Sequence, residues 1–525
     1  MDIRRTCLTL LVASGCARQH PALQLAPTDV SVILTSAAGT GPVAPTHTPR
    51  SEVAAHLTVH LDRERQTFLG IGGSLTQASA AALATLSPEK RQEVLQAYFG
   101  PEGAHYALSR THIASSDFSE ESYSYVPEAD PTLMSFSVQV DEDNGLLPLI
   151  RAAKAIPGSD FALVASPWTA PAWMKDNGKL YDPEAHVGGR LLPEHNETFA
   201  RYFVEYLRAY ADEGIDVWAV TPVNEPQGNG GAWESMDMSA EEQRDFVKIL
   251  GPTLRNAGFD TKILVFDQNR AEMADYTEVI YGDAAASAHA WGTGVHWYNS
   301  TTKVYEDVLD AQHARWPDKP IVHTEGTADN IATALSCADA CPNVPCGCEE
   351  EDAWWQDDGW YWSKEATDWG WDWAPEREVD HPKYAPAFRY ARDLVVGMNH
   401  WIAGWIDWNI ALNRQGGPNH VGNWCLAPVM VDGETNTVYY TPLFHVLSQV
   451  SRHSRPGGVV LETALDGPEG LHAAAIRNPD QTVAVHVFNE TVDDLTYRLA
   501  IGQRTLTLTS PSASLQTIVL PETGP

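Results

Sequence analysis

Residues 217–227 read VWAVTPVNEPQ, and this stretch decides the fold class of the chain. An apolar, β-branched run ends abruptly in Asn224, Glu225 and Pro226. An amide and a carboxylate at the mouth of a buried strand contribute little to stability, but the carboxyl end of a barrel strand is where catalytic groups lie. The stretch therefore predicts a strand that delivers polar side chains to a site.

Seven other stretches repeat this pattern, in which a short apolar run ends in a polar tip and a helical segment follows. With the stretch above, the eight candidate strands cover residues 68–73, 106–113, 161–168, 217–225, 262–268, 293–299, 319–327 and 403–409. Strands that alternate with helices in this number predict an α/β fold, a (β/α)8 TIM barrel. A doubly wound parallel sheet is the weaker alternative.

Residues typical of helix N-termini support the alternation of strands with helices. Ser87 is a cap residue ahead of Pro88, a residue favoured at the first helical position. Ser239 and Glu242 have the spacing of a capping box before an amphipathic run. Both sites predict helices that begin where the barrel pattern requires them.

After about residue 445 the pattern changes to short alternating strands that are separated by turn residues. Their spacing of about eight to twelve residues is typical of a β-sandwich. We expect a strand around 54–61 to join this domain and another strand at 31–35. The predicted organisation is a signal peptide at 1–20, a linker with N-terminal strands of the β domain at 21–60, a catalytic barrel at 61–445 with a Cys- and Trp-rich insertion at 328–381, and a β-sandwich at 446–525.

The overall charge restricts the partners. Acidic residues outnumber basic ones 69 to 35, which gives a formal net charge of −34. Such a field repels polyanions, so nucleic acid is not expected as a partner. No apolar run approaches the roughly 18 residues that a membrane span needs.

The N-terminus, MDIRRTCLTLLVASGCARQH, has two arginines, a short apolar stretch and then small residues. This order is typical of an export signal, so we expect a periplasmic, extracellular or outer-membrane location. Ala13–Cys16 resembles a bacterial lipoprotein cleavage box, and lipidation of Cys16 would tether the protein to a membrane. An ordinary cleaved signal or a disordered tail are the alternatives.

Four of the seven cysteines crowd into twelve residues: Cys337, Cys341, Cys346 and Cys348. Their C-x3-C-x4-C-x-C spacing matches none of the usual paired zinc patterns. In an exported protein two local disulfides are the simpler explanation, and a metal site is the alternative. Their pairing stays open.

Two glutamates stand at the predicted strand tips that face each other across a barrel. Glu225 ends the fourth strand and Glu325 the seventh. Cleaving an acetal requires an acid that protonates the leaving oxygen and a carboxylate that meets the oxocarbenium-like carbon. A sugar ring binds to aromatic faces and to hydrogen-bonding groups. The carboxyl ends of other predicted strands supply such groups: Arg110, Asp117, Trp168, His296, Tyr298 and Trp408.

Each of these residues also has an ordinary explanation. A single glutamate after a strand is more often a helix cap or a surface charge. Trp168 and Trp408 alone would more often be core residues, and His296 is more often a hydrogen-bonded structural histidine. The joint occurrence of both glutamates at strands four and seven favours the catalytic interpretation.

Seven ordered motifs resemble the family 30 glycoside hydrolases, specifically their acid β-glucosidase (glucosylceramidase) branch. They are FLGIGGSLTQASA, LSRTHIASSDFS, LVASPWTAPAWMKDNG, WAVTPVNEP, GVHWY, HTEGT and GWIDWNIALNRQGGPNHVGNW. The resemblance implies that Glu225 is the acid/base and Glu325 the nucleophile, and that Asn224 holds the 2-hydroxyl of the sugar. It also implies that Arg110 and Tyr298 keep Glu325 ionised, and that four residues surround the glucosyl unit: Asp117, Trp168, Trp408 and Asn423.

The sequence departs from the lysosomal member of that branch at several positions. Gln77 stands where that relative has Asp, Gly326-Thr327 follows the nucleophile, and His420 and Gly422 replace Trp and Arg. The insertion at 328–381 follows the nucleophile directly. Its tryptophans could stack on a second sugar or an acyl chain, or pack over the barrel rim. The glucose pocket is therefore expected to be intact, whereas the identity of the leaving group is not decided by the sequence.

The prediction is an exo-acting retaining β-glycoside hydrolase that releases β-glucose and needs no cofactor or metal. Its substrate is a carbohydrate or glycolipid, with glucosylceramide and β-linked gluco-oligosaccharides foremost. The alternatives are a β-1,6-glucanase or β-xylosidase of the same family, or a catalytically silent glycan-binding protein. Asp117 favours glucose over xylose. A metal-dependent hydrolase that uses His296, His323 and Asp407 lacks a recognisable ligand spacing. Nothing in the sequence predicts an oligomeric state.

Overall fold

The computed structural model describes residues 23–24, 30–36, 39–44, 52–300, 303–329, 385–423 and 425–521. The predictions for the leader, including lipidation of Cys16, lie outside the described residues. So do most of the insertion at 328–381 and its four cysteines. None of the described helices is long and apolar enough to cross a membrane.

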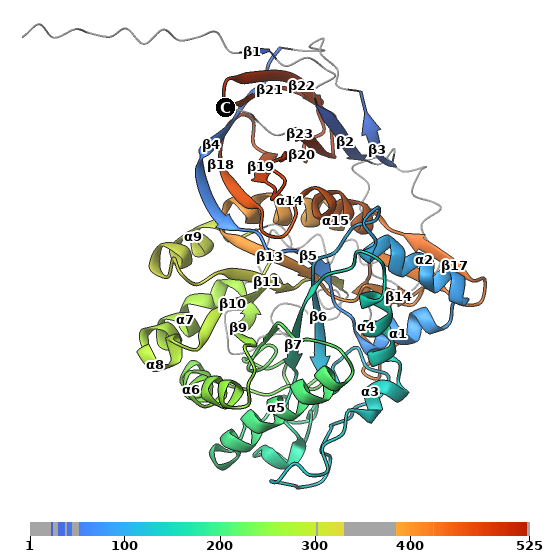
Figure 1. Ribbon diagram of the computed structural model, residues 1–525, viewed down its shortest axis with the longest axis vertical. Helices are drawn as coiled ribbons and strands as arrows, with labels where there is room; N and C mark the ends of the chain where they lie inside the picture. The colour runs from blue at the N-terminus through green and yellow to red at the C-terminus, as the bar shows by residue number, and fades with distance from the viewer. Residues whose placement is uncertain are drawn as a thin grey trace, which may run out of the picture.

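A parallel sheet of eight strands forms the centre of the molecule (Figure 1). Each of the eight predicted runs overlaps one strand, which confirms the barrel. In sheet order from β5 the strands follow as β13, β11, β10, β9, β8, β7 and β6. Their bounds are β5 (Gly70–Gly73), β6 (Leu108–Ile113), β7 (Ala162–Pro167), β8 (Ala219–Val220), β9 (Lys262–Asn269), β10 (Ala290–His296), β11 (Ile321–Glu325) and β13 (Ile402–Asp407).

The sheet closes where β5 meets β6. The Ala107 amide donates to the Ile71 carbonyl at 3.0 Å, and the Leu75 amide donates to the Arg110 carbonyl at 2.8 Å. Gly72 makes this approach feasible, because a Cβ at this position would lie 1.1 Å from the carbonyl oxygen of Leu108. The alternative of an open, doubly wound sheet is therefore wrong.

A compact set of apolar side chains fills the barrel interior. Six strands contribute one buried residue each to a cluster of its own: Leu108, Val164, Ala219, Leu264, Val322 and Ile406. Such packing makes the barrel a solid core without a pore, so polar chemistry is confined to its end.

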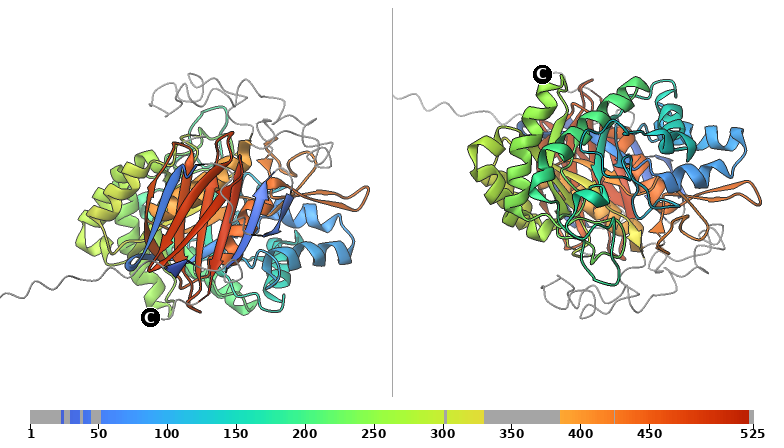
Figure 2. Two further views of the ribbon diagram at one scale, coloured as in Figure 1. Left: turned by 90° about the horizontal axis from the view of Figure 1, so that it is seen from above. Right: turned by 90° about the horizontal axis from the view of Figure 1, so that it is seen from below.

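The helices lie outside the strands (Figure 2). Their apolar faces are buried against the strands. Ser87 accepts a hydrogen bond from the Lys90 amide, and Ser239 and Glu242 form the predicted capping box. The helices are α1 (Gln77–Ala84), α2 (Pro88–Phe99), α3 (Gln139–Asp143), α4 (Leu146–Lys154), α5 (Asn196–Asp212), α6 (Ala240–Asn256), α7 (Met273–Gly282), α8 (Ala284–Ser287), α9 (Glu306–Arg315), α14 (Ala385–Asn399) and α15 (Pro442–His453).

The second domain is a ten-stranded sheet that curls over itself into two layers (Figure 1). A separate apolar cluster, which includes Leu57, Val485 and Leu508, fills the space between the layers. This confirms the predicted β-sandwich. The strands are β1 (Leu23–Gln24), β2 (Ser31–Ser36), β3 (Gly39–Val43), β4 (Ala55–Thr67), β18 (Val459–Asp466), β19 (Leu471–Arg477), β20 (Val483–Asn489), β21 (Leu495–Ile501), β22 (Arg504–Ser510) and β23 (Ser514–Leu520).

Strand β4 joins the two domains. It pairs with β18 as far as Thr67, so the sequence-based boundary at residue 61 falls inside a strand of the sandwich. The boundary at residue 445 falls inside α15, which lies with α14 between the sandwich and the barrel (Figure 1). Hydrophobic patterning alone does not show which domain such a shared element serves.

Two small sheets border the loops at the barrel end. One pairs β12 (Ala328–Asp329) with β15 (Cys425–Leu426), and places the segment after Glu325 against the segment that follows the GGPNHVGN motif. The other contains β14 (Ala411–Asn413), β16 (Val429–Asp432) and β17 (Thr437–Tyr440).

Candidate active site

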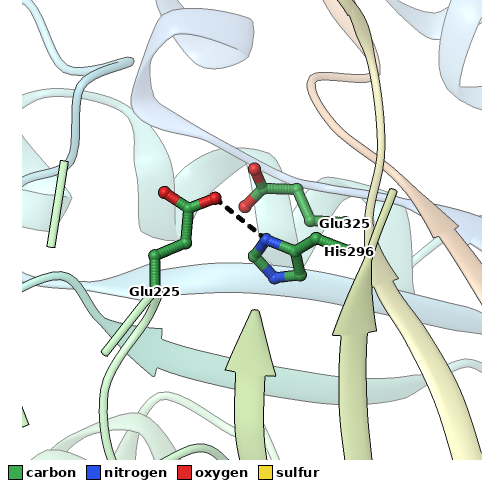
Figure 3. Close-up of side chains that lie close together, drawn as sticks. All are labelled: Glu225, His296 and Glu325. Atoms are coloured by element: carbon green, nitrogen blue, oxygen red, sulfur yellow. Dashed lines mark hydrogen bonds and ion pairs between the residues drawn. The ribbon is translucent and has the colours of Figure 1, made fainter. Parts of the chain in front are cut away.

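The two predicted catalytic glutamates meet at the carboxyl end of the barrel. Glu325 is the last residue of β11 and is buried, whereas the side chain of Glu225, which follows β8, is 12% exposed. One carboxylate oxygen of each glutamate and one ring nitrogen of His296 lie within 4.8 Å of one another (Figure 3). Carboxyl groups about 5 Å apart can act as a nucleophile and an acid/base on one glycosidic bond.

Both oxygens of Glu325 are held in place. Arg110 Nη1 donates to Oε2 at 2.5 Å, and the Tyr298 hydroxyl donates to Oε1 at 3.0 Å. Burial raises the pKa of Glu325, while His296 and Arg110 lower it and Glu225 raises it further. Arg110 therefore acts in the predicted direction, but the net shift of the Glu325 pKa is upward because the carboxylate has lost its water.

His296 joins Glu225 to a third carboxylate. Its Nδ1 lies 3.1 Å from Glu225 Oε1, and its Nε2 lies 3.1 Å from Asp267 Oδ1. Burial alone would lower the pKa of His296, but the Glu325 charge and the hydrogen bonds to Asp267 and Glu225 raise it to about 9. At neutral pH the ring is therefore an imidazolium that donates from both nitrogens.

Arg110 lies beneath the sugar-facing groups and is fully buried. Its Nη2 donates to Asn224 Oδ1 and to Asp267 Oδ2, both at 2.8 Å. Because the oxygen of Asn224 is occupied, its amide nitrogen is the group left to donate to a ligand. The guanidinium carbon also lies 5.1 Å from the ring centroid of Trp168 and 5.9 Å from that of Trp408.

The other predicted sugar contacts gather on the same side. Trp168 and Trp408 stack with their ring centroids 5.1 Å apart. Asn423 Nδ2 lies 3.4 Å from Asp117 Oδ2, while Asp117 Oδ1 is buried and has no hydrogen-bond partner among the described residues. Burial, with Glu325 and Glu225 next, raises the pKa of Asp117 well above its usual range. A buried oxygen without a partner is suited to receive a ligand hydroxyl.

Two of the departures have clear roles in the structure. Gln77 is held by Glu120: its Nε2 donates to Oε2 at 2.8 Å, and its Oε1 accepts from the Glu120 amide at 2.6 Å. His420 lies 3.3 Å from Glu234 Oε2 and forms an ion pair that is adjacent to the loop of Asp117. Burial alone would lower the pKa of His420, but the hydrogen bond and the charge of Glu234 raise it.

Sequence reasoning missed Asp267, the most connected carboxylate of the site. It is the residue before last in the run 262–268, which was predicted as the fifth strand and given no role. The signal that could have found it is the same as for the two glutamates, because it is an acidic residue at the carboxyl end of a barrel strand.

The three residues of the rival metal site are not brought together. His323 Nδ1 contacts Arg270 Nη2 at 3.0 Å, and Asp407 Oδ1 accepts from the Tyr390 hydroxyl at 2.5 Å. His296 is engaged by two carboxylates and carries a proton on each nitrogen, and a metal ligand must be neutral imidazole. His296, His323 and Asp407 therefore do not form a metal site together.

Comparisons with known proteins agree with this geometry. The chain is 29% identical over 444 residues to the lysosomal acid glucosylceramidase of Mus musculus. The aligned region covers 84% of this chain and 78% of the mouse protein. The chain is 27% identical to the endo-1,6-beta-D-glucanase neg1 of Aspergillus fumigatus, with 91% of each chain covered. The crystal structure of SrfJ from Salmonella typhimurium superposes with a TM-score of 0.78 at 25% identity, and covers 94% of this chain and all of that one.

Family models match both domains. Residues 68–335 and 361–454 match the glycosyl hydrolase family 30 TIM-barrel domain, and residues 457–518 match the glycosyl hydrolase family 30 beta sandwich domain. The barrel and the sandwich are thus the two domains of one known architecture. The chain belongs to glycosyl hydrolase family 30 and is a glycosidase that acts on carbohydrate.

Proposed function

We propose that this protein is a retaining, exo-acting β-glycosidase that releases β-glucose from glucosides. The observation that carries the proposal is the separation of Glu225 and Glu325, whose closest oxygens lie within 4.8 Å. Retaining enzymes hold their two carboxyl groups about 5 Å apart, and inverting enzymes leave about 6.5–9.5 Å for a water molecule.

In the first step Glu325 attacks the anomeric carbon. The bond from that carbon to the leaving oxygen breaks, and Glu225 gives its proton to that oxygen. Arg110 and Tyr298 aim the attacking carboxylate, since each binds a different oxygen of Glu325. The product of this step is a glucosyl ester of Glu325.

In the second step water cleaves the ester, and Glu225 removes the proton of that water. Two inversions at the anomeric carbon leave the product in the β configuration. Three carboxylates, those of Glu225, Glu325 and Asp267, face the cations of Arg110 and His296. Glu225 has the most exposed side chain of these three carboxylates, so it is the one that a leaving group and water can reach most easily.

Glucose fits the polar groups above the carboxylates. Asn224 can donate to the 2-hydroxyl, where hydrogen bonds strengthen in the transition state. Asp117 and Asn423 can bind hydroxyls on the far side of the ring, including the hydroxymethyl group that xylose lacks. The likeness to a glucosylceramidase supports glucosylceramide as a substrate beside β-linked gluco-oligosaccharides.

A β-1,6-glucanase is the second candidate. It is favoured by the likeness to an endo-1,6-beta-D-glucanase, which extends over 91% of both chains. Products separate the two activities, because an exo-glucosidase yields only glucose from a β-1,6-linked glucan, whereas an endo-acting enzyme yields oligosaccharides first.

The test measures initial rates on 4-nitrophenyl β-D-glucoside, the corresponding β-xyloside and a β-1,6-glucan. Glu325→Ala should lose about a thousandfold or more in kcat. Azide should then restore turnover of a 2,4-dinitrophenyl glucoside and yield the α-glucosyl azide, because it attacks from the face that Glu325 occupied.

Glu225→Ala is the matched variant. Azide should yield the β-glucosyl azide here, because it intercepts the glucosyl ester without needing a general base. If the two variants give the same anomer, or if the wild type releases α-glucose first, the double displacement is wrong.

The proposal includes export, which the leader supports. Lipidation of Cys16 is one form that export would take, and an ordinary cleaved signal without a lipid is the alternative. Membrane fractionation of cells that carry Cys16→Ser tests the tether, since an unchanged distribution between membrane and soluble fractions would exclude it.

A further inference from the structure

Asp267 occupies an unusual backbone position at the end of β9. Gly294 of β10 pairs with Phe266 and Val295 with Gln268, so Asp267 is the extra residue of a bulge. Its φ is 65°, in the left-handed region. Bulges re-aim side chains, and here the carboxylate points into the barrel and is fully buried.

The facing strand leaves room for this carboxylate. A Cβ at Gly294 would lie 3.1 Å from Asp267 Oδ1, which is tighter than ordinary contact. A larger residue at this position would therefore press on the carboxylate. The bulge on β9 and the glycine on β10 together form the seat of Asp267.

The carboxylate is saturated with donors. Oδ1 accepts from Thr324 Oγ1 at 2.6 Å and lies 3.1 Å from His296 Nε2. Oδ2 accepts from Arg110 Nη2 and Thr221 Oγ1, both at 2.8 Å. Ser166 Oγ also donates to Oδ2, at 3.3 Å. Three hydroxyls therefore fix the carboxylate itself, so it can in turn fix the orientation of the imidazolium and of the guanidinium.

Those two cations are the groups that bind the catalytic carboxylates. Arg110 donates to Glu325, and His296 donates to Glu225. The main chain adds a third link, because the Glu225 amide donates to the Asp267 carbonyl at 2.9 Å. A single side chain thus links Asp267 to each catalytic glutamate: Arg110 links it to Glu325, and His296 links it to Glu225.

We propose that Asp267 is the positioning residue that sets the nucleophile and the acid/base relative to each other. It acts through Arg110 on Glu325 and through His296 on Glu225, and it does not touch the substrate. The roles of the two glutamates rest on the proposed function, whereas the contacts of Asp267 do not.

Asp267→Asn tests the proposal because it keeps the shape and removes the charge. We expect kcat to fall about a hundredfold, the scale of a misplacement near 1 Å, while KM stays within about threefold. The loss should be similar for 4-nitrophenyl and 2,4-dinitrophenyl glycosides. The better leaving group needs little acid catalysis, so an equal loss requires that the nucleophile is also misplaced.

Asp393→Asn is the matched control. Asp393 is a buried carboxylate in α14 that is bound by Arg270 at 2.7 Å and by Trp405 Nε1 at 2.9 Å. Among the described residues Asp393 contacts neither catalytic glutamate, so its loss should lower the melting temperature and leave kcat within about threefold. Such a result separates positioning from general damage to the barrel.

Thr324→Val is the second variant and decides the matter if Asp267→Asn does not fold. It keeps the charge and the shape and removes one donor to Oδ1, so kcat should fall about tenfold with KM unchanged. The proposal is overturned if folded Asp267→Asn, or Thr324→Val in its place, keeps kcat within about threefold. It is also overturned if kcat falls for the 4-nitrophenyl glycoside but does not fall for the 2,4-dinitrophenyl glycoside.

The variants are compared with the wild type on the substrate that the wild type cleaves fastest, which is chosen from the β-glucoside, the β-xyloside and the β-1,6-glucan. The effect of the leaving group is then measured with the 4-nitrophenyl and 2,4-dinitrophenyl glycosides of the same sugar. Failure of the glucosidase assignment would be visible in the wild type alone. The test of Asp267 would still be decided on the alternative substrate.

Discussion

At the scale of single residues, left-handed backbone occurs at several non-glycine residues at the carboxyl ends of the barrel strands. Glu225, Phe266, Asp267 and Asn409 have φ values of 48°, 74°, 65° and 53°. Each such residue costs on the order of 1–3 kcal/mol, and such strain clusters where side chains must be aimed. Neither Glu nor Phe favours this conformation, so the sequence carries no signal for it.

Asp141 permits a residue-scale prediction about pH. It is buried among Tyr123, Tyr125 and Tyr210, whose hydroxyls all donate to it. Burial outweighs these bonds and raises the pKa of Asp141 to about 6. An acid whose folded pKa exceeds its unfolded value stabilises the fold at low pH, and this contribution is lost as the pH rises through about 6.

We therefore expect the free energy of unfolding of the wild type, relative to Asp141→Asn, to fall by about 3 kcal/mol between pH 4 and pH 7. Urea titrations across this range measure it. Gln139→Asn, at an exposed position in the same helix α3, is the control, because it removes no titratable group and should show a flat difference. A flat difference for Asp141→Asn as well would contradict the prediction.

The closure of the barrel belongs to the scale of elements. A methyl group at position 72 would meet the Leu108 carbonyl oxygen, which is backbone and cannot move aside without opening the seam between β5 and β6. We expect Gly72→Ala to destabilise the protein by more than about 4 kcal/mol or to prevent folding. Soluble yield and urea midpoints measure this.

Gly282→Ala supplies the control for that variant. Gly282 is the last residue of α7, and no atom lies within 4 Å of a Cβ built there. The substitution should change stability by no more than about 0.5 kcal/mol. Equal behaviour of the two alanine variants would show that the seam tolerates a side chain.

At the scale of the whole molecule, the two domains share a hydrophobic core. Val460, Phe488 and Leu515 of the sandwich belong to the same buried cluster as the residues beneath the barrel helices. Strand β4 and helices α14 and α15 lie at this junction (Figure 1). Separation of the domains would expose this apolar surface, so they should unfold together.

Tryptophan fluorescence can test this cooperativity because all eighteen tryptophans lie between residues 168 and 424, outside the sandwich. Hydrogen exchange of peptides from residues 483–520 reports the sandwich. We expect both signals to change at the same urea concentration. Two separate midpoints would show that the sandwich is an independent unit.

The sequence by itself determined the eight barrel strands, the sandwich strands and the two glutamates at strand tips. These features follow from local rules: hydrophobic period, cap residues and the position of polar groups after apolar runs. Even β8 was found, although only Ala219–Val220 have ladder pairing and the predicted run continued to Glu225.

Only the tertiary structure decided how these residues act together. It joined Arg110, Asp267 and His296 into one hydrogen-bonded group, and it left one carboxyl oxygen of Asp117, Oδ1, buried without a partner among the described residues. These contacts link residues that are far apart in the chain and depend on a bulge and on barrel closure. Local sequence rules do not contain such distances, because they arise only when eight strands close into one ring.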